Sequence, residues 1–174
     1  VHVSTLLNLA APTYLYLTRV AGKPCMAMND AEGNFLLVDF EGRVTTMVPE
    51  KVASGGDLNV EDLDGDGVDE FIYACGESVG IYDGKGKLKG EYVWKDARLG
   101  FPYTYRFSAQ DIRVGLVDVA KRRLFLTCGA GLSKGFPISG NAPFSIAFFD
   151  KGTTGFYLFA GNEEKQLLKY RVVR

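Results

Sequence analysis

Hydrophobic and polar residues alternate in short runs along most of the chain, and hydrophobic residues at helical spacing are almost absent. Alternation with a period of two places one side of an extended backbone against a core, which is typical of β-strands. The 21 glycines punctuate these runs and favour frequent tight turns. The pattern therefore predicts an all-β protein.

The runs also repeat. A strand, a tight turn and a second strand recur at a spacing of roughly 44 to 45 residues, which is the length of a four-stranded propeller blade. The segment 80–93 aligns with 125–138 when one gap is allowed, and 37–44 fits the same template. The repeat predicts a β-propeller of four blades in a single domain, 1–174. The expected blades cover about 13–49, 57–94, 103–139 and 143–174.

The fourth expected blade lacks one strand, because only 144–149, 155–160 and 166–173 have strand character. We expect the unassigned apolar run at 3–9 to supply the missing strand and close the ring, since closure removes exposed sheet edges. In the alternative, the chain is a fragment of a larger propeller. The chain begins with Val1 rather than Met, which is typical of a mature form or an excised piece.

One acidic stretch interrupts the second expected blade between its first two strands. Ca²⁺ takes about six to eight oxygen ligands, and a tight loop with acids at alternate positions directs their carboxylates inward. The predicted ligands are the side chains of Asp62, Asp64, Asp66 and Glu70 and the carbonyl of Val68. The bend between them requires a positive φ, which Gly67 adopts without strain. These ligands nearly fill the coordination sphere, so a structural Ca²⁺ is expected.

Two other interpretations of this loop are weaker. Asp and Gly are common in turns, so the stretch would be a solvated acidic loop if its spacing were accidental. An EF-hand requires a bidentate Glu at the twelfth loop position, and Tyr73 stands there within a run of β character. The ligand spacing favours a cation site between two strands.

The segment 57–72 around the acidic loop resembles the FG-GAP and VCBS repeats of integrin α-chain propellers and of many bacterial surface proteins. The turn 135–137 also resembles one found in such bacterial blades. The resemblance implies a Ca²⁺-binding loop that stiffens its blade, and an extracytoplasmic location, where Ca²⁺ is abundant. It extends to one loop only, because the bends at 21–23, 109–111 and 151–153 lack the three acids.

Aromatic residues provide the candidates for partner binding. Phe101, Tyr103, Tyr105 and Phe107 alternate, which places them on one face of an extended segment. Such a face either packs between neighbouring blades or binds a sugar ring or a peptide. Trp94 borders an expected loop. Trp94, Tyr103 and Tyr105 are therefore the candidate binding residues for a protein or glycan partner.

The composition argues against several other classes of function. A formal net charge of −1 disfavours a nucleic-acid-binding surface, and no hydrophobic run is long enough for a transmembrane segment. The single histidine, His2, excludes histidine triads and histidine-rich metal sites. Cys25, Cys75 and Cys128 lie in separate apolar runs and are expected to be buried thiols, with one disulfide as the alternative.

Together these features predict a non-enzymatic, extracytoplasmic β-propeller module that one Ca²⁺ loop stabilises and that binds a protein or glycan partner. Two alternatives remain open. In the first, the chain is a catalytic or accessory part of a carbohydrate-active enzyme, for which a cleft lined by convergent acids is expected. In the second, it is a structural spacer of a larger surface protein. The sequence does not determine the oligomeric state.

Overall fold

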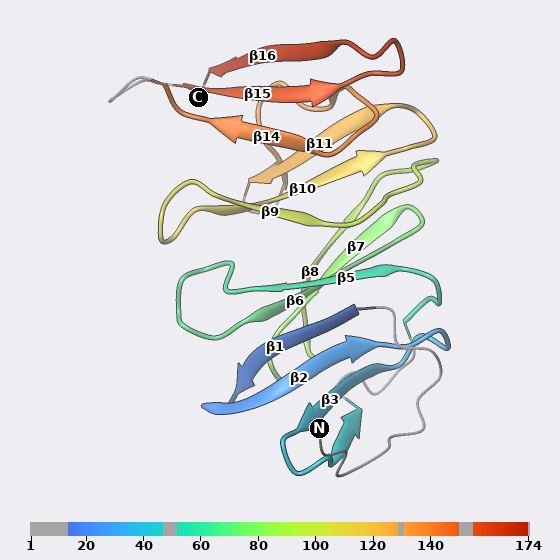
Figure 1. Cartoon of the computed structure of the whole chain (residues 1–174), viewed down its shortest axis with the longest axis vertical. Coiled ribbons are helices and arrows are strands. Elements are labelled where there is room, and N and C mark those ends of the chain that lie inside the picture. Colours follow the sequence, from blue (N-terminus) through green and yellow to red (C-terminus); the bar gives the residue numbers. More distant parts are fainter. Residues whose placement is uncertain (1–13, 47–51, 129–130, 150–154, 174) are drawn as a thin grey trace, which may run out of the picture.

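The computed structural model describes residues 14–46, 52–128, 131–149 and 155–173. These residues form sixteen β-strands and no helix. The strands make four antiparallel sheets, which stack along the long axis of the molecule (Figure 1). The prediction of an all-β protein is confirmed.

The first two sheets are simple meanders, in which every strand pairs with its neighbours in the sequence. The first sheet consists of β1 (Tyr14–Val20), β2 (Lys23–Asn29), β3 (Phe35–Asp39) and β4 (Val44–Thr46). The second consists of β5 (Asp57–Glu61), β6 (Glu70–Cys75), β7 (Ser78–Tyr82) and β8 (Leu88–Val93). The strands of these two sheets lie within the first two expected blades, at about 13–49 and 57–94.

The third and fourth sheets follow the same scheme with a modified outer edge. The third sheet consists of β9 (Tyr103–Arg106), β10 (Ile112–Asp118), β11 (Arg123–Cys128), β12 (Gly131–Leu132) and β13 (Ile138–Ser139). The fourth consists of β14 (Phe144–Ala147), β15 (Gly155–Gly161) and β16 (Leu167–Val173). A four-stranded blade has a single outer strand, but here β12 and β13 pair separately with β11. The ladder is interrupted because Gly135 has a φ of 88° and Pro137 has no N–H to donate.

Three hairpin connections use the same five-residue turn, beginning at Asp30, Asp39 and Asp83. In each turn one carboxylate oxygen accepts the N–H groups of the third and fifth residues at 2.8 to 3.0 Å. The fourth residue is a glycine with φ near 80°, a conformation that disfavours a side chain. The short Asp/Gly segments of the sequence are therefore turn-forming segments.

Apolar clusters fill the three spaces between adjacent sheets. The largest fully buried side chains in them are Phe35, Phe71, Phe125 and Phe156. Each such side chain contributes roughly 1.5 to 3 kcal/mol by burial. The second and third sheets are buried on both faces, which explains why β6 and β10 are almost continuously apolar.

Polar side chains connect the first strands of neighbouring sheets. The Tyr16 hydroxyl donates to the Leu58 carbonyl at 2.6 Å, and the Asn59 amide donates to the Pro102 carbonyl at 2.8 Å. The Tyr105 hydroxyl donates to the Phe144 carbonyl in the same way. These bonds connect the first strands of neighbouring sheets, β1 to β5, β5 to the residue before β9, and β9 to β14.

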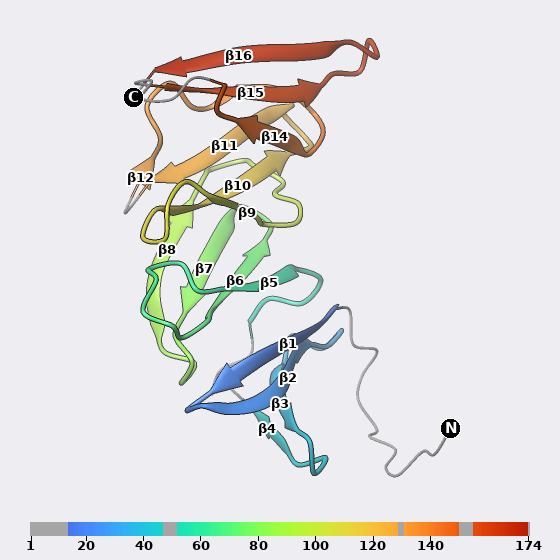
Figure 2. The ribbon, with the colours of Figure 1, turned by 60° about the vertical axis from the view of Figure 1, so that its left-hand side comes forward.

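The first and fourth sheets lie at opposite ends of the stack (Figures 1 and 2). The described residues therefore form an open array of propeller-like sheets. The expected closing strand at 3–9 lies outside the described residues, so closure of a four-bladed ring by that strand stays a prediction.

All three cysteines are free thiols. Cys25 is buried as predicted, but Cys75 is half-buried and Cys128 is exposed, because the last lies at the end of β11. Within the described residues, no helix is long and apolar enough to cross a membrane.

Candidate metal centre

The acidic loop connects β5 to β6 and packs against the third sheet. Gly65 and Gly67 have φ values of 78° and 86°, so the prediction of a positive φ at Gly67 is confirmed. A Cβ at Gly65 would overlap the carbonyl oxygen of Ala109. Glycine at position 65 therefore allows both the bend and the close approach of the β9–β10 connection.

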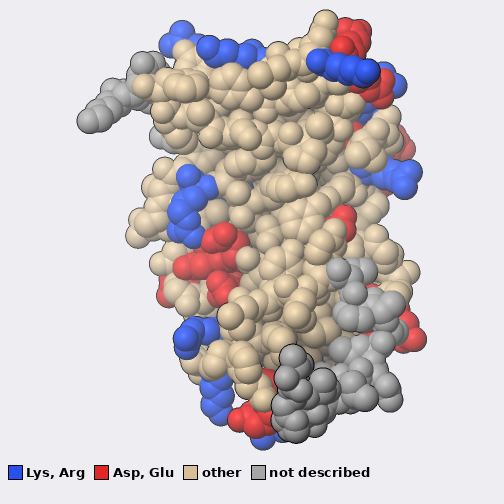
Figure 3. Space-filling model, in the orientation of Figure 1, with Lys and Arg blue, Asp and Glu red and all other residues tan. Residues whose placement is uncertain are grey.

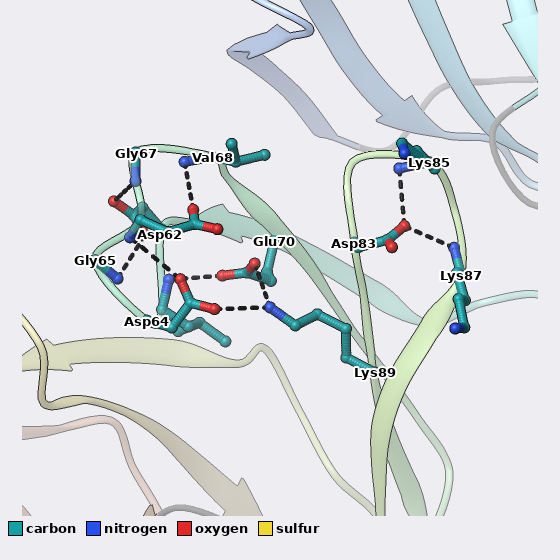
Figure 4. Close-up of polar contacts among 12 residues, drawn as sticks. Asp62, Asp64, Gly65, Gly67, Val68, Glu70, Asp83, Lys85, Lys87 and Lys89 are labelled. Atoms are coloured by element: carbon teal, nitrogen blue, oxygen red, sulfur yellow. Dashed lines mark hydrogen bonds and ion pairs between the residues drawn. The ribbon is translucent and has the colours of Figure 1, made fainter.

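Asp62 organises the backbone of the loop. Its Oδ1 accepts the N–H groups of Gly65 at 2.8 Å and Asp66 at 3.1 Å, and its Oδ2 accepts the N–H of Gly67 at 3.0 Å. The carboxylate thus holds the loop in a tight turn around itself (Figure 4).

Three of the predicted ligands converge. One carboxylate oxygen from each of Asp62, Asp64 and Glu70 lies within 4.8 Å of the other two. A Ca²⁺ ion bound at about 2.4 Å from each oxygen spans about 4.8 Å between opposite ligands. The three oxygens therefore fit one hard cation, and the all-oxygen donor set suits Ca²⁺.

The other two predicted ligands are placed differently. The Asp66 side chain is not part of this cluster, and its Oδ1 accepts the N–H of Val68 at 2.8 Å. The side chain of Val68 is exposed. Ligation by Asp66 and by the Val68 carbonyl stays a prediction.

A lysine that the sequence reasoning missed lies within the cluster. The ammonium of Lys89, on β8, is 2.8 Å from Oδ2 of Asp64 and 2.8 Å from Oε1 of Glu70 (Figure 4). Lys89 is 19 residues from Glu70, and β7 separates their strands. No local pattern in the sequence indicates this contact.

The environment shifts the pKa values of Asp64 and Glu70 in opposite directions. The ammonium of Lys89 lowers the pKa of Asp64. Glu70 is only 2% exposed, and this burial raises the pKa of its carboxyl despite the hydrogen bonds from Lys89 and from the N–H of Leu63. The buried acid is therefore the member of the cluster that most needs a neighbouring cation.

A cavity of about 380 Å³ lies beside the cluster, between the second and third sheets. Asp64, Glu70 and Lys89 line it on one side, and Val114 and Thr127 of the third sheet line the other. The cluster is thus accessible to a small ion.

Two of the aromatic candidates take part in packing between sheets. The Trp94 ring stacks on Phe125 of the third sheet with centroids 4.8 Å apart. The Tyr105 ring stacks on Phe144 of the fourth sheet, also at 4.8 Å. Burial raises the pKa of Tyr105. These contacts correspond to the packing interpretation, and a contact of Trp94 or Tyr105 with a partner stays a prediction.

Tyr103, the first residue of β9, lies in a group of aromatic rings near the first strands of the sheets. Its ring makes an edge contact with Phe101 at 5.0 Å, and Phe101 contacts Tyr14 of the first sheet at 5.3 Å. Tyr14 is 39% exposed, and the charge of Asp57 raises its pKa. The sequence indicated Tyr103 but not the neighbours contributed by the first and second sheets.

The stack of antiparallel meanders joined through their first strands defines a β-propeller-like fold. No family model matches the chain, and no curated protein sequence is significantly similar to it. Two solved structures that share the fold are crystal structures of BBS1N in complex with ARL6DN, one soaked with mercury and one with lead.

These structures share the architecture but little sequence. The mercury-soaked structure has a TM-score of 0.60 and 11% identity over 95% of this chain. The lead-soaked structure has a TM-score of 0.62 and 10% identity over 94% of this chain. The chain spans about half of BBS1N, since 52% of that chain is covered in both. At this identity the likeness concerns the fold alone.

Proposed function

We propose that the chain is a non-enzymatic β-propeller-type module that binds a protein partner, and that its four sheets are part of a larger propeller-like array. The similar structures support the general class, because BBS1N is recorded in a complex with a protein, ARL6DN. The open stack supports the larger array, because the first and fourth sheets lie at opposite ends (Figure 1).

The observation that carries the proposal is the outer face of the fourth sheet, which we call the end face. It consists of Phe149, Tyr157, Phe159, Leu167, Lys169, Arg171 and Val173. Three large apolar residues of the end face are highly exposed: Phe149 is 63% exposed, Leu167 is 73% exposed and Val173 is 56% exposed. Exposed apolar clusters of this kind mark surfaces that bind other polypeptide.

The occupant of the end face is inferred from the three interfaces inside the stack. At each of them the apolar face of one sheet packs on the apolar face of the next. Phe156 and Leu158 of β15 face inward to the third sheet, so the alternating Tyr157 and Phe159 face outward. A further β-sheet with an apolar face is therefore the partner that fits, as in sheet packing generally.

The charge of the end face adds a second requirement for the partner surface. The Lys169 ammonium lies 4.5 Å from the Tyr157 ring centroid on the end face, and basic side chains lie along this end of the molecule (Figure 3). A partner surface with acidic residues at its rim would complement it. This arrangement is distinct from a closed four-bladed ring, in which the run at 3–9 would pair with β16.

We also propose that Asp62, Asp64 and Glu70 hold a Ca²⁺ ion that orders the loop and stiffens the second sheet. Binding to the folded state alone would stabilise that state by mass action. The acidic side chains gather at the level of the second sheet (Figure 3). An extracytoplasmic location remains part of this proposal, because Ca²⁺ is abundant outside cells.

Site-specific photocrosslinking tests the binding role of the end face. A photoreactive phenylalanine replaces Leu167 in the full-length protein in its native host, and the same group replaces Phe40, which is 64% exposed at the opposite end of the stack. We expect position 167 to yield a covalent adduct whose crosslinked peptide, mapped by mass spectrometry, belongs to a β-sheet surface. No adduct at position 167, or the same adduct from both positions, would show that the end face binds no specific polypeptide.

A further inference from the structure

We propose that Lys89 is an internal counter-cation that competes with a divalent cation for Asp64 and Glu70, so that binding of the ion requires release of the lysine. This inference rests on the proposed cation role of the loop. It adds the residue that sets the affinity of the site and the change in the protein that accompanies binding.

The first argument is the assignment of the individual carboxylate oxygens. In Glu70, Oε2 accepts the N–H of Leu63 at 2.8 Å, and Oε1 contacts the Lys89 ammonium. In Asp64, Oδ1 accepts the N–H of Asp66 at 3.2 Å, and Oδ2 contacts the same ammonium. Lys89 therefore occupies, in each acid, the oxygen that the backbone leaves available to a metal ion.

The second argument is charge. A divalent cation bound to these carboxylates would lie within a few ångströms of an ammonium that contacts the same groups, and like charges at that distance repel strongly. Conversely, Glu70 is almost completely buried, so without any cation its charge would lack compensation. One cation, either the lysine or the metal ion, satisfies the cluster.

The third argument is that the Lys89 side chain can leave the cluster and reach solvent. Its side chain is 39% exposed, compared with 3% for the side chain of Glu70. Lysine is a flexible point charge with a strongly hydrated ammonium, so it exchanges a carboxylate for water more readily than a fixed guanidinium does. The cavity of about 380 Å³ beside the cluster gives the released side chain space.

Calcium titration of matched variants tests the competition. Lys89→Met keeps the length of the side chain and removes its charge, and Lys87→Met is the control, an exposed lysine in the same hairpin. Calorimetry should give a Ca²⁺ dissociation constant at least about tenfold lower for Lys89→Met than for the wild type, because two charge-assisted hydrogen bonds no longer compete. Lys87→Met should bind like the wild type.

A second readout follows the folded state. In chelator, Lys89→Met should melt at a lower temperature than the wild type and Lys87→Met, because Glu70 loses its counter-charge. Added Ca²⁺ should restore Lys89→Met more than it stabilises the wild type. Lys89→Arg keeps a fixed positive charge and should retain weak Ca²⁺ binding, even if Lys89→Met does not fold in chelator.

The outcomes separate the two proposals. Ca²⁺ binding by the wild type with equal or weaker binding by Lys89→Met would overturn the competition and leave the cation role of the loop intact. Lys89→Arg binding Ca²⁺ as tightly as Lys89→Met would overturn it as well, because charge would then not matter. Absence of Ca²⁺ binding in all variants, including folded Lys89→Met, would refute the cation role itself and the competition with it.

Discussion

Glu70 in the second sheet and Asp118 in the third are both buried carboxylates, with exposed fractions of 2% and 0%, but the protein neutralises them differently. Asp118 contacts the guanidinium of Arg123 through Nε at 3.0 Å and Nη2 at 2.6 Å. Its Oδ1 also accepts the backbone N–H groups of Arg98, Ala120 and Lys121. Glu70 has one backbone donor, Leu63, and a lysine that it shares with Asp64.

The number and type of donors explain the opposite pKa shifts of the two acids. Burial alone would raise the pKa of Asp118, but the N–H of Arg98, the Arg123 guanidinium and the N–H of Lys121 outweigh it and lower the pKa. At Glu70 the effect of burial dominates and raises the pKa. Asp118 therefore forms a structural ion pair with Arg123, whereas at Glu70 we propose that the neighbouring cation exchanges.

The largest effect that follows from this comparison is the loss of the Asp118 carboxylate. Asp118→Asn leaves Arg123 without its counter-ion and weakens three backbone hydrogen bonds, so the free energy of unfolding should fall by about 3 kcal/mol. Urea denaturation measures this change. The exposed Asp96, which is 3.4 Å from Lys121, provides the control Asp96→Asn, with an expected change below about 0.5 kcal/mol. Equal losses of unfolding free energy in the two variants would show that the buried Asp118–Arg123 pair stabilises the fold no more than an exposed carboxylate does.

The same carboxylate predicts the direction of the pH dependence. The pKa of Asp118 is lower in the folded state than in the unfolded state, so the folded protein holds the proton less tightly. Its contribution to stability is complete above about pH 5 and is lost as the pH falls through the unfolded and then the folded pKa. Urea denaturation at several pH values should show wild type and Asp118→Asn converging in acid. A constant difference between them would contradict the pKa shift.

At the acidic loop we expect a stabilisation of similar size that depends on bound Ca²⁺. Asp64→Ala removes one of the three converging carboxylates, so its melting temperature should no longer depend on Ca²⁺ or chelator. The wild type should gain about 2.7 kcal/mol when free Ca²⁺ is a hundred times the dissociation constant. Differential scanning calorimetry with and without chelator measures both. A chelator response that survives in Asp64→Ala would place the ion elsewhere.

A smaller effect tests how the loop depends on the third sheet. Gly65→Ala forces a side chain into a positive φ and against the Ala109 carbonyl, at an expected cost of about 2 kcal/mol. At Gly67 the φ is also positive, but an added Cβ meets no atom within 4 Å, so Gly67→Ala should cost about 1 kcal/mol. Gly90→Ala, with open space and no positive φ, is the control. Thermal unfolding in which the variants at positions 65 and 67 are equally stable would mean that the contact with Ala109 contributes nothing.

The sequence was informative wherever the determining interactions are local. Alternating residues placed β15 and β16 within one position of the runs predicted at 155–160 and 166–173, because each strand's pattern reflects only which side chains face a core. The Asp/Gly turns could be predicted equally well, since the carboxylates of Asp39 and Asp83 accept hydrogen bonds from backbone N–H groups two and four residues later. The convergence of Asp62, Asp64 and Glu70 followed from their spacing in one loop for the same reason.

Contacts that cross strands were decided only by the tertiary structure. The ion pairs of Lys89 depend on the order and register of β6, β7 and β8, and no residue near Lys89 in the sequence encodes them. Likewise, only the stacking of the sheets decided that the rings of Trp94 and Tyr105 pack against Phe125 and Phe144. The open stack and its exposed end face arise in the same way, because packing between sheets is a property of whole surfaces and not of local spacing.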